Sequence, residues 1–289
     1  MRVVGLHPDV LVVTSRVWQT TCTIVRSGDS RSAETATRSG TAGRSGDQPA
    51  PGAGTGECFV IDSPVFPDEL EVLPAILEHA GFPPLSGLLA THADWDHLLG
   101  RIAFPQAALG VAETTAARLA AEPGAAARGL RAFDDEHYVE RGAPLSLGQV
   151  QALPVPGHCE IGDADLELHP ADGHTADGMA VWIEWARVLV CGDYLSPVEV
   201  PMIGADGSRD AYLATLRRLE PLVAAAAHVV PGHGTVMDGV RAAAILREDV
   251  NYLANLPDAE LPMARRGAAQ RAIHAENVRR TSKPEGARS

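Results

Sequence analysis

Two imidazoles and two carboxylates lie within six residues of this sequence. His92, Asp94, Asp96 and His97 follow the short apolar run 87–90. Such a run predicts a buried strand, so the cluster falls at a strand end, where α/β folds place their ligand sites. Imidazole nitrogens mixed with carboxylate oxygens suit zinc, iron or manganese. The cluster therefore predicts a metal site, with the acidic start of a solvated helix as the alternative.

Three later segments favour the metal site over this alternative. His174, Asp193 and His233 each stand beside a glycine, shortly after an apolar run. A glycine at the end of a strand lets the backbone turn sharply while the neighbouring side chain stays at the edge of the sheet. We therefore expect these three residues to join the first cluster.

Taken in order, these segments resemble the metallo-β-lactamase-fold hydrolases. Their pattern is His-x-His-x-Asp-His, followed by a distant His, an Asp and a final His, each at a strand end. The resemblance spans Val10 to about Leu256, and it departs from the pattern at Asp94, where the family has its second His. The glycine that usually follows the distant His by three residues is also missing, and Gly178 stands one position further on.

The resemblance implies a fold and a cofactor. The fold is α/β (α+β), a four-layer αβ/βα sandwich with two mixed β-sheets face to face and helices outside. The cofactor is a pair of divalent metal ions, zinc first, with iron or manganese as alternatives. By analogy, the ligands fall into two groups that share Asp193: site one with His92, Asp94 and His174, and site two with Asp96, His97 and His233.

The implied reaction is hydrolysis of an ester, thioester or lactone of a small molecule by a metal-bridging hydroxide. Asp96 is the expected catalytic residue, which orients the nucleophile and passes its proton to the leaving group. Asp94 adds a negative charge and a harder oxygen to site one, so we expect site one to be less selective for zinc than all-His relatives. In the resembled family, the strand that corresponds to Cys58–Asp62 ends in an Asp near the metal site, so the resemblance implies that Asp62 supports the ligands.

Two other functions stay open. One is a non-haem diiron oxidoreductase related to the flavodiiron proteins, whose second ligand is a Glu, although the segment after Leu256 is too short for their flavin domain. The other is a non-catalytic metal-binding scaffold. β-Lactamase activity is disfavoured, because those enzymes usually lack a His such as His97 directly after the Asp and are exported. The segment Pro156-Gly157-His158 is similar to the loops that carry the proposed ligands. A polar turn and a further strand separate it from His174, so His158 is not expected to be a ligand.

Composition narrows the class of protein further. The chain has 289 residues, 45% of them hydrophobic and 21% charged, which is typical of a globular protein. Its net charge of −13 argues against nucleic acid as a partner, and no apolar run is long enough to cross a membrane. The start of the chain lacks a secretory leader, so we expect a cytoplasmic enzyme. The four cysteines are scattered, and only Cys191 lies near a proposed ligand.

The chain is predicted to divide at residue 262. Residues 1–262 form the hydrolase domain, which includes a disordered loop insertion over 27–57 that is poor in large apolar residues. Residues 263–289 form a basic helix and a flexible tail, and this helix is the segment expected to mediate a homodimer.

Periodicity predicts the remaining elements. Strands are expected at Val10–Val13, Thr20–Val25, Ala107–Val111, Val150–Leu153, Leu166–His169, Ala180–Glu184, Val188–Val190 and His228–Val230. Those from Val150 onward are expected to form a second, β-rich half. Helices are expected at Pro67–Ala80, kinked or begun at Pro74, and at Glu113–Ala121, Ser208–Leu219, Thr235–Leu256 and Met263–Arg280. The helix over 235–256 is expected to face inward with Val240, Ala244, Ile245 and Leu253.

Overall fold

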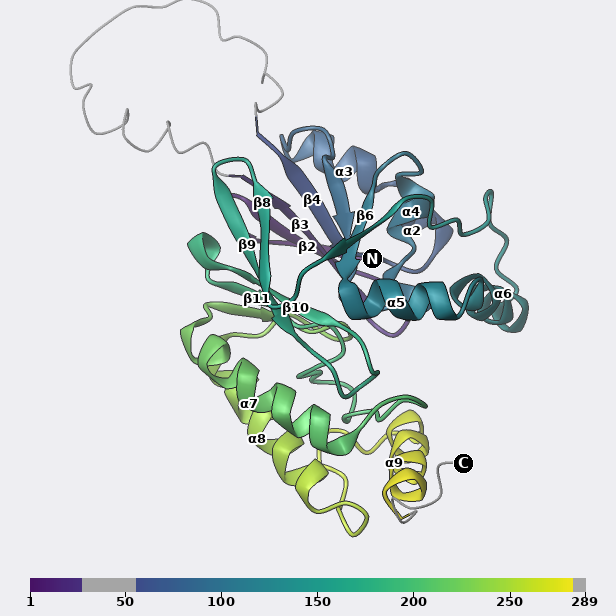
Figure 1. The fold of residues 1–289 in the computed structure, drawn as a ribbon, viewed down its shortest axis with the longest axis vertical. Coiled ribbons are helices and arrows are strands. Elements are labelled where there is room, and N and C mark those ends of the chain that lie inside the picture. Colours follow the sequence, from purple (N-terminus) through teal and green to yellow (C-terminus); the bar gives the residue numbers. More distant parts are fainter. Residues whose placement is uncertain (28–55, 283–289) are drawn as a thin grey trace, which may run out of the picture.

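The structure is a computed structural model that describes residues 1–27 and 56–282. The predicted loop insertion over 27–57 lies outside the described residues except at its two ends. The C-terminal tail also lies outside them. Figure 1 shows two sheets with helices on their outer sides, and the chain passes from the first sheet into the second.

The first sheet has seven strands in the order of the sequence. They are β1 Arg2–His7, β2 Val10–Thr14, β3 Thr21–Arg26, β4 Cys58–Asp62, β5 Gly87–Leu89, β6 Leu109–Ala112 and β7 Val150–Leu153. The pairs from β1 to β4 are antiparallel, and those from β4 to β7 are parallel. The sheet is therefore mixed, as predicted. Its parallel strands β5 and β6 are apolar and buried throughout, as strands covered on both faces are.

The second sheet has five strands in the order β12-β11-β10-β9-β8. They are β8 Gly157–Ile161, β9 Ala164–Pro170, β10 Met179–Ile183, β11 Val188–Val190 and β12 His228–Val230. The expectation that Val150–Leu153 opens this half is wrong. That strand is β7 and pairs with β6 in parallel, because the helices between the two strands form the crossover that a parallel pair requires.

Two predicted helices differ from the structure at proline. The helix expected over 67–80 is two helices that meet at Val72, and Pro74 lies in the first turn of the second, where its missing N–H costs nothing. The helix expected to end at Leu219 continues to Ala225 with Pro221 inside it. Val240, expected to face inward, is 82% exposed.

The helices of the described residues are α2 Pro67–Glu71, α3 Leu73–His79, α4 Gly100–Ala103, α5 Glu113–Ala121, α6 Ala125–His137, α7 Arg209–Ala225, α8 Gly239–Ala254 and α9 Ala268–Thr281. Two short 3-10 helices are η1 Trp95–His97 and η2 Glu184–Ala186. In the described part of the chain, no helix combines the length and the apolar character needed to cross a bilayer.

Three apolar clusters hold the layers together. One lies between the sheets and includes Val12, Ile61 and Val181. A second packs α2, α3 and α6 against the outer face of the first sheet. The third packs α7 and α8 against the second sheet (Figure 1). This arrangement is the predicted four-layer αβ/βα sandwich.

The C-terminal helix α9 packs against the cluster formed by α7 and α8. Ile273 and Val278 contact that cluster, and Asn277 is fully buried. The division at residue 262 and the homodimer stay predictions.

Candidate metal centre

The structure brings all seven predicted ligand positions together at one edge of the sandwich. They come from the ends of strands: His92 and Asp94 follow β5, Asp96 and His97 lie on η1, His174 lies between β9 and β10, Asp193 follows β11, and His233 follows β12. The histidines are between 1% and 6% exposed, so their imidazoles face the interior of this edge.

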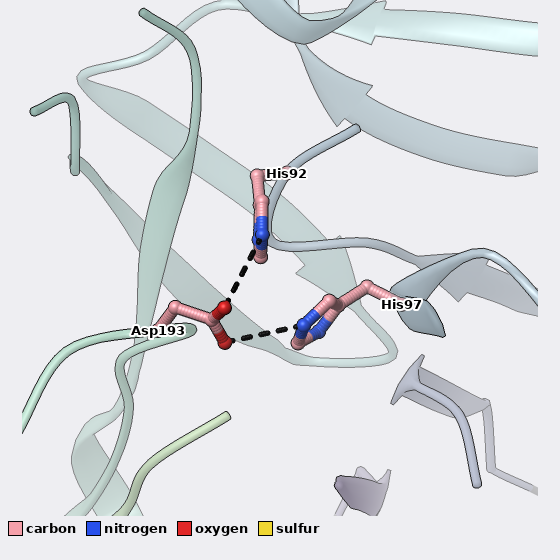
Figure 2. Close-up of side chains that lie close together, drawn as sticks. All are labelled: His92, His97 and Asp193. Carbon is pink, nitrogen blue, oxygen red and sulfur yellow. Dashed lines mark ion pairs between the residues drawn. The ribbon is translucent and has the colours of Figure 1, made fainter. Parts of the chain in front are cut away.

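Asp193 lies between two groups of ligands. Its Oδ2 is 3.7 Å from His92 Nε2 and 3.3 Å from His174 Nε2. Its Oδ1 is 3.2 Å from His97 Nε2 and 3.3 Å from His233 Nε2. Figure 2 shows the carboxylate between His92 and His97, with one oxygen toward each. The geometry is that of a carboxylate shared between two sites.

The other two carboxylates complete these groups. Asp94 Oδ2 is 3.6 Å from His92 Nε2 and 3.4 Å from His174 Nε2. Asp96 Oδ2 is 3.6 Å from His97 Nε2 and 3.4 Å from His233 Nε2. The donor atoms therefore gather into the two sets expected as site one and site two.

The donor set fits metal ions. Ligands about 2.0–2.2 Å from a tetrahedral zinc ion lie about 3.3–3.6 Å from one another, close to the distances found here. Among the described residues, His92 Nε2, His97 Nε2, His174 Nε2 and Asp193 Oδ1 are buried without a hydrogen-bond partner. Burying a polar atom without a partner costs free energy, which a bound cation would recover.

Backbone carbonyls set the orientation of two imidazoles. His174 Nδ1 is 2.8 Å from the Met202 carbonyl, and His233 Nδ1 is 3.3 Å from the Trp18 carbonyl. Since a carbonyl only accepts, the contact with Met202 places a proton on His174 Nδ1. The lone pair of the neutral ring is then on Nε2, which points into the site.

Asp62 supports the other two imidazoles. Its Oδ2 is 3.1 Å from His97 Nδ1. It also accepts a hydrogen bond of 3.0 Å from the Thr91 hydroxyl, whose oxygen lies 3.1 Å from His92 Nδ1. Asp62 therefore lies behind both histidines, at the position expected for a supporting residue.

The ligands shift one another's pKa in the metal-free chain. Burial alone would lower the pKa of His174, but Asp94 and Asp193 outweigh it and raise this pKa to about 9. The pKa of His233 rises to about 10 by the same balance, through Asp193 and Asp96. Burial acts to raise the pKa of Asp193, yet His233 and His97 hold it well below its usual range. Imidazolium and carboxylate thus stabilise each other until a metal replaces the protons.

A small hollow of about 20 Å³ borders the centre and is lined by His174, Asp193, His233 and Glu199, among others. Burial raises the pKa of Glu199, and His233 opposes this effect. Sequence reasoning missed Glu199, because nothing in its neighbourhood marks it as anything but a loop residue.

Sequence reasoning also missed two residues beside site one. Arg118 of α5 donates to Asp94 Oδ1 at 2.9 Å and to Asp177 Oδ1 at 2.8 Å. Asp177 also accepts the Ala93 amide at 3.0 Å. Asp177 stands three residues after His174, at the position where the family usually has glycine, and this departure was the available signal.

The residues expected to lie outside the centre do so. His158 is exposed on β8. The Cys191 thiol is buried and lies 3.2 Å from the Tyr194 carbonyl and 3.3 Å from the Val230 carbonyl, which accounts for its orientation.

Comparison with known proteins identifies the family of the chain. The family model of the metallo-β-lactamase superfamily matches residues 53–233, and the chain belongs to that superfamily. A metallo-β-lactamase from Pontibacter korlensis is 19% identical with a TM-score of 0.59, and the match covers 88% of this chain and 99% of that one. A metallo-β-lactamase family protein from Thermus thermophilus is 19% identical with a TM-score of 0.58, over 85% and 79%.

The DIM-1 metallo-β-lactamase is 17% identical with a TM-score of 0.55, and the match covers 88% of this chain and 96% of that one. At these low identities, the structural similarity establishes the shared fold alone. None of the curated proteins compared with the chain matches it.

Proposed function

We propose that the protein is a dinuclear metal-dependent hydrolase that cleaves an ester, thioester or lactone of a small molecule. The observation that carries this proposal is the position of Asp193, which directs one oxygen to His92 and His174 and the other to His97 and His233. A shared carboxylate of this kind serves two metals that are held close together.

The residues of the chain would divide the work of this reaction. Two bound metals would supply a water of lowered pKa and would polarise the carbonyl that it attacks. Asp96 directs its Oδ2 toward His97 and His233, at the edge of the centre. Asp96 is therefore the residue that orients the attacking water and protonates the leaving group.

Zinc is the metal that we propose first, since imidazole and carboxylate ligands with these separations suit it. Two expectations from the sequence remain part of the proposal: a small-molecule substrate instead of nucleic acid, which the net charge of −13 supports, and a cytoplasmic location.

The test is a screen of nitrophenyl esters, thioesters and lactones with protein reconstituted with zinc. We expect metal-dependent hydrolysis, and a kcat about 10²- to 10⁴-fold lower in Asp96→Asn, the range for loss of a general acid–base group. His158→Ala is the matched control, because His158 is exposed on β8 away from the ligands. Protein that holds two zinc ions and hydrolyses no member of the three substrate classes would contradict the proposal.

A second candidate is a diiron oxidoreductase, and Asp94 is the observation that favours it. A carboxylate in place of the family's second His makes site one harder and more anionic, which suits iron. Iron as the main metal of the purified protein, together with a visible iron–oxo absorption, would favour this candidate over the hydrolase.

A further inference from the structure

We propose that Arg118 is a positioning residue for site one, which fixes Asp94 as a ligand through a single oxygen and joins the two loops that carry the site-one ligands. This inference rests on the metal centre of the proposed function. It concerns how a chain with Asp in place of the family's second His still builds an ordered site.

The two oxygens of Asp94 have different neighbours. Oδ1 accepts a hydrogen bond of 2.9 Å from Arg118 Nη2. Oδ2 faces His92 Nε2 at 3.6 Å and His174 Nε2 at 3.4 Å. A free carboxylate rotates and often binds a metal through both oxygens. With Oδ1 held by Arg118, only Oδ2 remains for the metal, so Asp94 offers one donor atom, as an imidazole does.

Arg118 also links the loops on either side of site one. Its Nη1 donates to Asp177 Oδ1 at 2.8 Å, and Asp177 Oδ2 accepts the amide of Ala93 at 3.0 Å. Ala93 lies between the ligands His92 and Asp94, and Asp177 lies in the loop of His174. The guanidinium therefore connects α5 to both loops, and a planar fork can serve two carboxylates at once.

The alternative role for an arginine beside a metal site is to bind a substrate anion. Arg118 is poorly suited to it, because three carboxylates already surround the guanidinium: Asp94, Asp177 and, at 3.6 Å from Nε, Asp206. Its side chain is 22% exposed, so it is also partly enclosed by the protein. A positioning role accounts for these contacts. The positive charge of the guanidinium also offsets the negative charge that Asp94 adds.

The test measures metal binding directly, by competition with a chromophoric chelator and by titration with cobalt(II). We expect Arg118→Met to weaken binding of one of the two metal ions about 10- to 100-fold, the usual effect of removing a residue that orients a ligand. The cobalt spectrum of that site should also weaken, because Asp94 becomes free to bind through both oxygens and raises the coordination number. Arg131→Met, on the exposed face of α6, is the matched control and should bind both ions as the wild type does.

Two further variants separate positioning from folding or charge. Arg118→Lys keeps the charge but lacks the fork, so it should recover only part of the lost affinity. In an Asp94→His background, Arg118→Met should cost less affinity than in the wild type, because an imidazole has no second oxygen to restrain. Thermal melts of the metal-free variants report any general loss of fold.

The outcomes distinguish this inference from the proposed function. Wild-type affinity for both ions in Arg118→Met, or complete recovery in Arg118→Lys, would overturn the inference and leave the hydrolase standing. If Arg118→Met loses one ion while the wild-type protein hydrolyses none of the substrates, the inference is supported and the hydrolase proposal is contradicted. A wild-type protein that binds no metal would overturn both.

Discussion

The carbonyl oxygen of Met202 lies 2.8 Å from His174 Nδ1, and this carbonyl is held in place by the last helix of the chain. Asn277 of α9 accepts the amide of Ile203 at 3.0 Å and donates to the carbonyl of Pro201 at 2.6 Å. These two bonds lie on either side of Met202. Asn277 therefore fixes a loop that orients the proposed ligand His174, although Asn277 contacts no proposed ligand itself.

Asn277→Ala should accordingly weaken metal binding at site one. The loop from Pro201 to Ile203 would lose both hydrogen bonds, and the His174 ring would lose its fixed orientation. We expect affinity for one metal ion to fall about 10-fold or more, as for other residues that orient ligands. Chelator competition measures this. Asn255→Ala, at the exposed end of α8, should leave both affinities unchanged, and equal affinities in the two variants would contradict the account.

Asp62 should affect both sites, because it contacts His97 directly and His92 through Thr91. Asp62→Ala removes the acceptor for both and should lower the affinity for each metal ion about 10- to 100-fold. Asp62→Asn retains one acceptor oxygen, so its affinity for each metal ion should lie between that of Asp62→Ala and that of the wild type. Asp68→Asn, on the exposed part of α2, is the control. If Asp62→Ala weakens the binding of one ion only, the link through Thr91 is unimportant.

Arg265 should contribute mainly to stability. It is fully buried, 2.7 Å from Asp249 Oδ1, and donates to the carbonyls of Ser196 and Glu199. Arg265→Met leaves Asp249 buried without its cation and should lower the free energy of unfolding by about 3–5 kcal/mol in urea titrations. Burial raises the pKa of Asp249 to about 7, and only Arg265 opposes this.

Exchanging both partners, as in Arg265→Met with Asp249→Leu, should recover part of that loss. Arg266→Met is the exposed control and should change stability by less than about 0.5 kcal/mol. A double variant less stable than Arg265→Met alone would contradict the pairing.

The stability of the metal-free protein should fall as the pH rises. The pKa values of His174 and His233 are raised to about 9 and about 10, above the ordinary value of 6.5. A raised pKa stabilises the fold fully below pH 6.5 and ceases to do so as the pH passes through the folded value. Metal binding requires deprotonated imidazoles, so its affinity should rise over the same range.

The difference in melting temperature between zinc-loaded and metal-free protein should therefore grow from pH 6.5 to pH 10. Differential scanning calorimetry at several pH values measures it. If the difference in melting temperature shrinks over this range, groups other than His174 and His233 dominate the pH dependence of stability.

The proposed ligands could be picked out from the sequence because each lies in a local pattern, a His or Asp next to the end of an apolar strand. His92, His97 and Asp193 are of this kind, and their meeting follows from the fold. The supporting residues could not be found in this way. Arg118 and Asn277 lie on helices whose faces depend on tertiary packing, and the Met202 carbonyl carries no side-chain signal.

The same limit explains the errors in the fold. Val150–Leu153 reads as a strand from its sequence, but which sheet it joins depends on the crossover through α5 and α6. Val240 fits a helical stripe, yet it lies in the first turn of α8, where the helix starts outside the core. Periodicity describes an element and leaves its neighbours undetermined.

The metal content of the protein is the most direct test of the central claim. Protein purified without chelators or a His tag would be analysed by plasma mass spectrometry, together with His174→Ala and His233→Ala. The account predicts about two equivalents of metal in the wild type and about one in each variant, because the two histidines serve different sites. A wild-type value near zero, or loss of both ions in either variant, would contradict two sites that share Asp193.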